Sequence, residues 1–83
     1  MSLIKYPLST EKSIRLMELE NKLIFIVDRN SNKKEIKKEL EKTYDVKIKK
    51  INTLITPAGK KKAYITFSDE TPAIDLATKL GIM

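Results

Sequence analysis

The chain has 83 residues, of which 41% are hydrophobic, so it can form one small domain with a modest core. It contains no cysteine and no histidine, which excludes disulfides and thiolate metal sites and removes the commonest general base. The net charge is +6, and residues 29–62 hold twelve basic and four acidic side chains, whereas the remainder holds five basic and seven acidic ones. A basic middle favours a polyphosphate partner, although a solvated lysine-rich surface accounts for the charge equally well.

The N-terminal third predicts two strands with a helix between them. Ser2–Tyr6 is a candidate edge strand, and the proline after it ends the strand because proline cannot donate to a sheet ladder. Ser9 or Thr10 can cap a helix that ends near Asn21. Lys22–Asp28 contains five apolar residues in a row. So short an apolar run is typical of a central strand covered on both faces, by the chain itself or by a partner.

A second helix follows and carries most of the central charge. Asn32 is its N-cap, and Glu35 completes a capping box three residues later. Ile36, Leu40 and Tyr44 recur every four residues, which predicts one narrow buried stripe surrounded by lysines.

These lysines differ in what they predict. Lys33 and Lys34 lie at the positive end of the helix dipole, where positive charge costs stability unless an anion is near. They are therefore candidates for anion binding. Lys38 and Lys42 are predicted to face solvent, and Lys37 can be neutralised by a glutamate one turn later.

Residues 45–67 predict a hairpin with a cationic end. Asp45–Thr56 is its first strand, in which Lys49-Lys50 breaks the alternation of apolar residues and indicates a β-bulge. Pro57-Ala58-Gly59 forms the turn, and three consecutive lysines follow it. Because like charges this close repel one another, a polyanion lying against them would stabilise the cluster. In the second strand, Lys62–Phe67, we expect an inward row of Ala63, Ile65 and Phe67 and an outward row of Tyr64 and Thr66.

The last element is a helix with Thr71 as its cap, Pro72 at its first position and Gly81 as its stop. Its apolar stripe consists of Ala73, Leu76, Ala77 and Leu80. The element order is therefore β-α-β-α-β-β-α over one domain, residues 1–83. This order predicts an α+β fold with a mainly antiparallel four-stranded sheet and helices packed on it.

The sequence offers little for catalysis. It has only two glycines, so a glycine-rich phosphate loop is excluded, and its carboxylates are scattered, so we expect no catalytic site, no metal site and no cofactor. An acylphosphatase-like enzyme would need an arginine in a glycine-rich loop, and neither Arg15 nor Arg29 has that setting. No apolar run approaches the ~20 residues of a membrane span, and no signal peptide is recognisable, so we expect a cytoplasmic protein.

Five segments carry a resemblance to a known family: residues 6–12 (YPLSTEK), 32–37 (NKKEIK), 45–48 (DVKI), 51–54 (INTL) and 61–68 (KKAYITFS). In this order and spacing the chain resembles the archaeal-type form of the L23 family of large-subunit ribosomal proteins, over nearly its whole length. The family signature usually has leucine where Phe67 stands.

The resemblance implies a structural, non-enzymatic role in the ribosome. Members of the family bind large-subunit (23S-type) rRNA beside the exit of the polypeptide tunnel, among neighbouring ribosomal proteins. They also form a docking point for nascent-chain factors such as the signal recognition particle and ribosome-bound chaperones. The family's docking acidic residue follows Ser or Thr and precedes Lys, and here that position is Glu11. Bacterial relatives have a longer hairpin loop that reaches into the tunnel, but only a few residues separate Thr56 from Lys60, so we expect no tunnel-lining role.

Residue pattern and resemblance together predict one RNA-binding set. Its lysines would neutralise phosphates, and its polar strand residues would donate hydrogen bonds to phosphate or 2′-hydroxyl oxygens. Asn52 and Thr53 could instead be polar residues at a ladder edge, and Tyr64 could pack on the outer sheet face rather than stack on RNA. The set comprises Lys12, Arg15, Lys33, Lys34, Lys37, Asn52, Thr53, Lys60, Lys61, Lys62 and Tyr64. Alternative functions are an RNA-binding or protein-interaction module outside the ribosome, with acidic ends that recruit a factor, and a small acylphosphatase-like enzyme.

Overall fold

The structure is a computed structural model that describes residues 3–81. These residues form three helices and four strands in the predicted order, which confirms the α+β class. The elements are β1 (Ile4–Pro7), α1 (Glu11–Glu20), β2 (Lys22–Val27), α2 (Lys33–Tyr44), β3 (Ile48–Ile55), β4 (Lys61–Phe67) and α3 (Ala73–Leu80). The predicted first strand began at Ser2, which lies outside the described residues.

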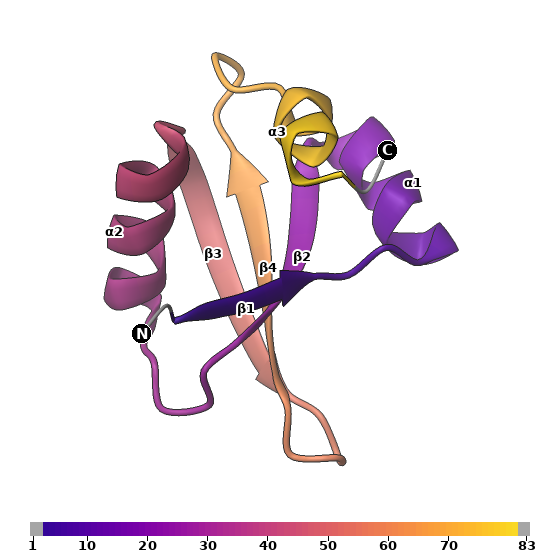
Figure 1. Cartoon of the computed structure of the whole chain (residues 1–83). Helices are drawn as coiled ribbons and strands as arrows, with labels where there is room; N and C mark the ends of the chain where they lie inside the picture. The colour runs from indigo at the N-terminus through magenta and orange to yellow at the C-terminus, as the bar shows by residue number, and fades with distance from the viewer. Residues whose placement is uncertain (1–2, 82–83) are drawn as a thin grey trace.

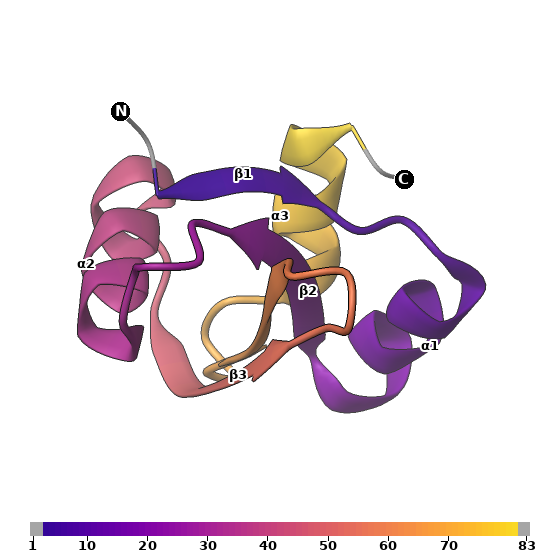
Figure 2. The same cartoon turned by 90° about the horizontal axis from the view of Figure 1, so that it is seen from below.

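The sheet is antiparallel, with strand order β1-β2-β4-β3. Strand β2 is thus internal, as predicted, and β1 and β3 are the edges. In Figures 1 and 2, α2 lies on the β3 side of the molecule and α1 on the opposite side, while β1 crosses the other strands at a steep angle. The turn of the β3–β4 hairpin projects beyond the helices at the lower end of Figure 1. The hairpin turn therefore stands clear of the three helices.

The hydrophobic core joins the sheet to all three helices. The core joins inward residues of β2 and β4 to apolar residues of every helix, including Met17, Ile36 and Leu76. The alternation predicted for the last strand is confirmed, because Ala63, Ile65 and Phe67 are buried whereas Tyr64 and Thr66 are half-buried.

The other face of the sheet carries polar and cationic residues around two isoleucines. Ile24 and Ile26 lie outside the core cluster, yet they are only 3% and 4% exposed. The protein's own side chains therefore cover both faces of β2, which answers the question that the sequence left open. Partners in an antiparallel ladder share a face, so Tyr64, which lies between Ile24 and Asn52, belongs to this outer face.

A β-bulge interrupts β3 where the sequence predicted it. Ile48 pairs with Phe67 and Lys50 with Thr66, so Lys49 is the extra residue. A similar shift in β1 lies between Ile4 and Tyr6, where no break in the sequence pattern predicted it.

The helix caps confirm most of the predicted ends and correct one. The Thr10 side chain caps α1, and Asn32 and Glu35 form the predicted capping box of α2. Thr71 was expected to cap α3, but this prediction is wrong, because Pro72 occupies the N-cap and makes no side-chain cap hydrogen bond. The Thr71 hydroxyl instead accepts a hydrogen bond from the Lys47 backbone N–H at 3.1 Å.

The first hairpin strand begins later than predicted. Asp45 is the C-cap of α2, in the left-handed conformation with φ of 53°, rather than the start of a strand. An aspartate tolerates this conformation better than most residues, which is why a helix can end here without a glycine.

Candidate nucleic-acid interface

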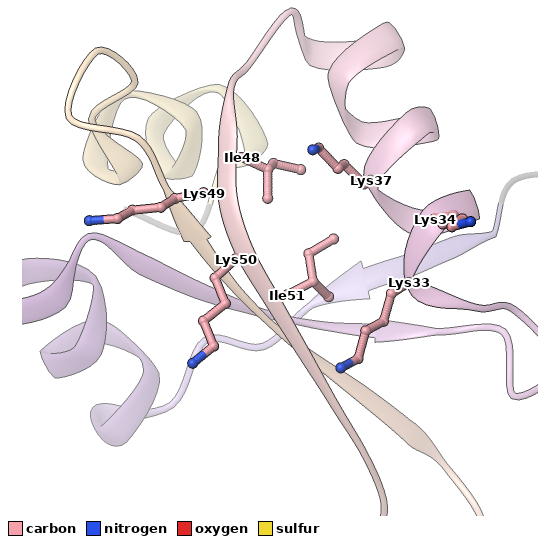
Figure 3. Close-up of a pocket in the computed structure, with 7 residues that line it drawn as sticks. All are labelled: Lys33, Lys34, Lys37, Ile48, Lys49, Lys50 and Ile51. Atoms are coloured by element: carbon pink, nitrogen blue, oxygen red, sulfur yellow. The ribbon is translucent and has the colours of Figure 1, made fainter.

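A shallow groove of about 220 Å³ lies between the N-terminal half of α2 and the edge strand β3. We call it the cationic groove. Ile48 and Ile51 form its apolar floor, and Figure 3 shows them pointing toward α2. In the same view Lys33 and Lys37 extend toward β3, whereas Lys34 points away from it. The lysines that line the groove are Lys33, Lys34, Lys37, Lys49 and Lys50.

The bulge in β3 builds the strand side of this groove. In a regular strand, residues three apart point to opposite faces, so Ile48 and Ile51 would not share one. The extra residue Lys49 shifts the phase, and both isoleucines become buried at 8% exposure on the inner side. Lys49 and Lys50 then both project to the other side of β3, as Figure 3 shows. Cationic side chains therefore lie on both sides of β3, with those of α2 on the inner side and Lys49 and Lys50 on the other.

The groove lysines have no neutralising partner among residues 3–81. The pair that Lys37 could form with Glu41 is absent, and the Glu41 carboxylate lies 3.5 Å from the Ile48 backbone nitrogen instead. Glu39 accepts hydrogen bonds from the Leu3 and Ile4 backbone nitrogens. The ion pairs within the described residues are Arg15–Glu11, Lys22–Glu20 and Lys47–Glu70. Excess positive charge at the start of α2 is thus left for an external anion.

Lys47 differs from the groove lysines, because an acidic side chain compensates its charge. Its ammonium lies 2.7 Å from the Glu70 carboxylate, with both side chains largely exposed. The hydrogen bond and the charge of Lys47 lower the pKa of Glu70, and the same contacts raise the pKa of Lys47. Lys47 is therefore a poorer candidate for binding phosphate than Lys49 or Lys50.

Lys50 links the groove to the outer sheet face, which we define as Lys50, Asn52, Lys62 and Tyr64. Lys50 pairs with Thr66, Asn52 with Tyr64, and Lys62 with Leu54, so these side chains project from the same face. Three members of the predicted RNA-binding set thus come together with a lysine that the prediction omitted.

Two other members of the predicted set lie elsewhere. Thr53 pairs with Ala63 and therefore lies on the inner side of the sheet, opposite to its neighbour Asn52. Lys61 also lies on the inner side, and its ammonium donates to the backbone carbonyl of Ser31. Because adjacent residues in a strand point to opposite faces of the sheet, the three consecutive lysines after the turn do not form a single surface.

The predicted residues on α1 form a third, separate region. Glu11, Lys12 and Arg15 line a broad hollow together with Leu19 and other residues of the helix. The Arg15 guanidinium lies 3.8 Å from the Glu11 carboxylate, and both side chains are exposed. Since α1 and α2 lie on opposite sides of the molecule (Figures 1 and 2), Lys12 and Arg15 are not brought near the cationic groove.

Sequence reasoning omitted Lys49 and Lys50 from the candidate site. The signal was available, because the break in alternation at these two lysines predicts a bulge, and a bulge places consecutive side chains on one side. Within residues 3–81 there is no group of acidic residues that could hold a metal ion. None of the helices there has the length and apolar character needed to span a membrane.

Comparison with known proteins gives a consistent match. The family described as "Ribosomal protein L23" matches residues 2–75. A similar protein is the large ribosomal subunit protein uL23 of Pyrobaculum aerophilum, which is 52% identical over 81 residues. The alignment covers 98% of this chain and 100% of that protein.

Proposed function

We propose that this chain, which belongs to the ribosomal protein L23 family, binds large-subunit rRNA through the cationic groove and the outer sheet face. The resemblance found in the sequence is confirmed by the full-length match to an archaeal uL23. The chain is accordingly a large-subunit ribosomal protein of the archaeal type, which works in the cytoplasm as part of the ribosome. We further propose that residues 1–83 act as one rRNA-binding domain, without enzymatic activity or a cofactor.

The observation that supports this proposal most strongly is the uncompensated charge around the cationic groove. Lys33 and Lys37 extend from α2 toward β3, Lys50 projects from the other side of β3, and none of the three has an ion-pair partner within the described residues. A helix N-terminus adds positive potential at Lys33. Such a surface matches the closely spaced phosphates of folded RNA.

The outer sheet face would extend this contact. Lys62 can neutralise a further phosphate, and the Asn52 amide can donate to a phosphate or 2′-hydroxyl oxygen. Tyr64 is half-buried between Ile24 and Asn52, so it can contact RNA with only part of its ring. The contact is therefore directed mainly at the shape and backbone of the RNA.

Equilibrium binding to a fragment of large-subunit rRNA at several salt concentrations tests the proposal. Each neutralised phosphate should contribute about 0.7 to 0.9 to the slope of log affinity against log salt. With the cations of both surfaces engaged, we expect a slope of roughly −4 or steeper. Binding that is undetectable, or that does not weaken as salt rises, would contradict the proposal.

We also propose the second role that the family resemblance implies, docking of nascent-chain factors at the tunnel exit. The acidic start of α1 supports it, because Glu11 is exposed and lies on the opposite side of the molecule from the cationic groove. The hairpin turn is short, with Thr56 and Lys60 joined by a backbone hydrogen bond of 2.8 Å. So short a turn supports a position at the exit rather than a loop that lines the tunnel.

Reversing the charge of Glu11 separates the two roles. In large subunits that carry Glu11→Lys, affinity for the signal recognition particle should fall roughly tenfold or more, because a like charge then faces the partner's basic surface. Binding of the variant protein to rRNA should not change. Glu18→Lys, an exposed substitution on the same helix, is the matched control. Equal losses in the two variants would contradict a specific role of Glu11, and loss of RNA binding as well would indicate a folding defect.

A further inference from the structure

Another hollow, of about 180 Å³, lies beside the hairpin turn and is separate from the cationic groove. We call it the tip pocket. The ends of β1 and β2 meet the turn here, so residues far apart in the sequence form its wall. They include Lys5, Tyr6, Ile26, Arg29, Gly59 and Lys60. Lys60 and Lys61, which also lines the pocket, belong to the RNA-binding set that the sequence predicted, whereas Tyr6 and Arg29 do not.

Tyr6 gives the tip pocket an exposed aromatic ring. Its side chain is 42% exposed, although it lies in the sheet opposite the buried Ile26. The Lys60 ammonium lies 3.3 Å from the Tyr6 hydroxyl oxygen and 5.9 Å from the ring centroid. The ammonium is therefore at the hydroxyl end of the ring rather than over its centre, which leaves ring surface for another planar group.

Three cations surround this ring without compensation. Lys5, Arg29 and Lys60 take part in none of the ion pairs found in residues 3–81. Asp28, the acidic residue beside Arg29, uses its carboxylate to accept a hydrogen bond from the Asn30 backbone nitrogen at 2.9 Å. A pocket that combines several free cations with one exposed aromatic ring is suited to a ligand that has both a phosphate and a planar base.

Gly59 brings the backbone of the turn beside Arg29 on the cationic side of the pocket. Its φ is +83°, which other residues rarely adopt, and a Cβ placed on it would lie 3.8 Å from Nη1 of Arg29. The guanidinium therefore lies directly beside bare backbone at the turn. Arg29 and Lys60 line the same pocket, so both can reach one phosphate group bound there.

We propose that the tip pocket binds a single unpaired nucleotide of the RNA, with its base stacked on Tyr6 and its phosphate held by Arg29 and Lys60. This inference rests on the proposed rRNA-binding function and adds a different mode of contact to it. A paired base offers no free face to an aromatic side chain, whereas an unpaired base in a loop or bulge does. The cationic groove has no aromatic residue in its lining, so it suits phosphates alone.

Substitutions at Tyr6 test the stacking directly. Tyr6→Leu should weaken binding to a large-subunit RNA fragment with unpaired loops on the order of tenfold. The salt slope should not change, because no charge is removed. Tyr6→Phe, which keeps the ring and loses only the hydroxyl, should bind as the original protein does. Arg29→Gln should lower affinity and also reduce the salt slope by about 0.7, the contribution of one phosphate on a single strand.

Two further measurements complete the test, and three outcomes would overturn one or both proposals. Photochemical cross-linking of the complex should attach an RNA base at Tyr6, and thermal unfolding should show that the variants remain folded. If Tyr6→Leu binds normally while lysine substitutions in the cationic groove weaken binding, the tip pocket proposal is wrong and the proposed function stands. If Tyr6→Leu weakens binding to fully paired RNA as much as binding to RNA with unpaired loops, stacking on an unpaired base is also wrong. If the original protein binds no RNA, both proposals fail together.

Discussion

Replacing Lys33, Lys37 and Lys50 together by glutamine should lower the affinity for a large-subunit rRNA fragment by about 10² at ~0.1 M salt. The slope of log affinity against log salt should become shallower by roughly 2 to 3, since each lysine that neutralises a phosphate contributes about 0.7 to 0.9. Both quantities come from one series of equilibrium binding measurements. The slope is the more specific of the two quantities, because it reports the number of phosphate contacts and not the stability of the protein.

The physical reason for this expected loss of affinity is that no acidic side chain among residues 3–81 neutralises these three lysines in the free protein. They have no ion pairs within the described residues, so the free protein gains nothing from them that RNA binding would have to replace. Lys33 and Lys37 extend toward β3 from α2, whereas Lys50 projects to the other side of the bulged part of β3, as Figure 3 shows. Their effects should therefore be close to additive unless one phosphate is shared by two of them.

A variant with the same loss of charge on other surfaces is the necessary control. Lys38, Lys42 and Lys79 are exposed, lie outside the groove and form no ion pair among residues 3–81. Their replacement by glutamine lowers the net charge equally and should change the slope by less than 1. If the two triple variants behave alike, binding follows net charge and the groove has no special role.

The groove also shows which features can be predicted from the sequence and which depend on the packing of the whole fold. The helix with its capping box, the bulge and the turn were all predicted from local patterns, because caps, phase breaks and glycine turns act over a few residues. Which lysines share a surface depends on pairing between strands and on packing of α2 beside β3. This is why Thr53 and Lys61 were placed with neighbours that lie on the opposite face, whereas Lys49 and Lys50 were missed although the bulge that exposes them was predicted.

The tip pocket could not be predicted for the same reason. Tyr6, Arg29 and Lys60 come from three segments that only the complete sheet brings together. A second example is the start of α3, where the sequence predicted a cap by Thr71. The cap comes instead from Asn21, far away in the chain, whose side-chain oxygen accepts a hydrogen bond from the Ala73 backbone nitrogen at 2.6 Å. No local pattern encodes such a contact.

Asn21→Ala should lower the free energy of unfolding by about 3 kcal/mol, through two separate causes. Asn21 ends α1 in the left-handed conformation, with φ of 54°, which alanine adopts at a cost of about 1 kcal/mol. Its side chain also joins α1 to the loop before α3. The amide nitrogen donates to the backbone carbonyls of Phe67, Ser68 and Thr71, at 3.1 to 3.2 Å. Losing these partners and the cap on Ala73 should account for about 2 kcal/mol more.

Two further variants separate the causes. Asn21→Gly keeps the left-handed conformation and removes the hydrogen bonds, so it should cost about 2 kcal/mol. Asp45 ends α2 in the same conformation, with φ of 53°, and its side chain makes no hydrogen bond to any of residues 3–81. Asp45→Ala should therefore cost only about 1 kcal/mol, the conformational part. All three values come from urea unfolding followed by circular dichroism.

The comparison between Asn21→Ala and Asp45→Ala decides whether the fold depends on this long-range cap. Both substitutions put alanine at a left-handed helix end, so their difference measures what the Asn21 side chain contributes beyond its conformation. Equal losses would mean that water replaces the asparagine at the start of α3 at no cost. A larger loss for Asn21→Ala, with unchanged RNA affinity at low temperature, would show that α1 and α3 are held together independently of the cationic groove. The end proposed for factor docking could then be destabilised by mutation while the surface proposed to bind RNA stays intact.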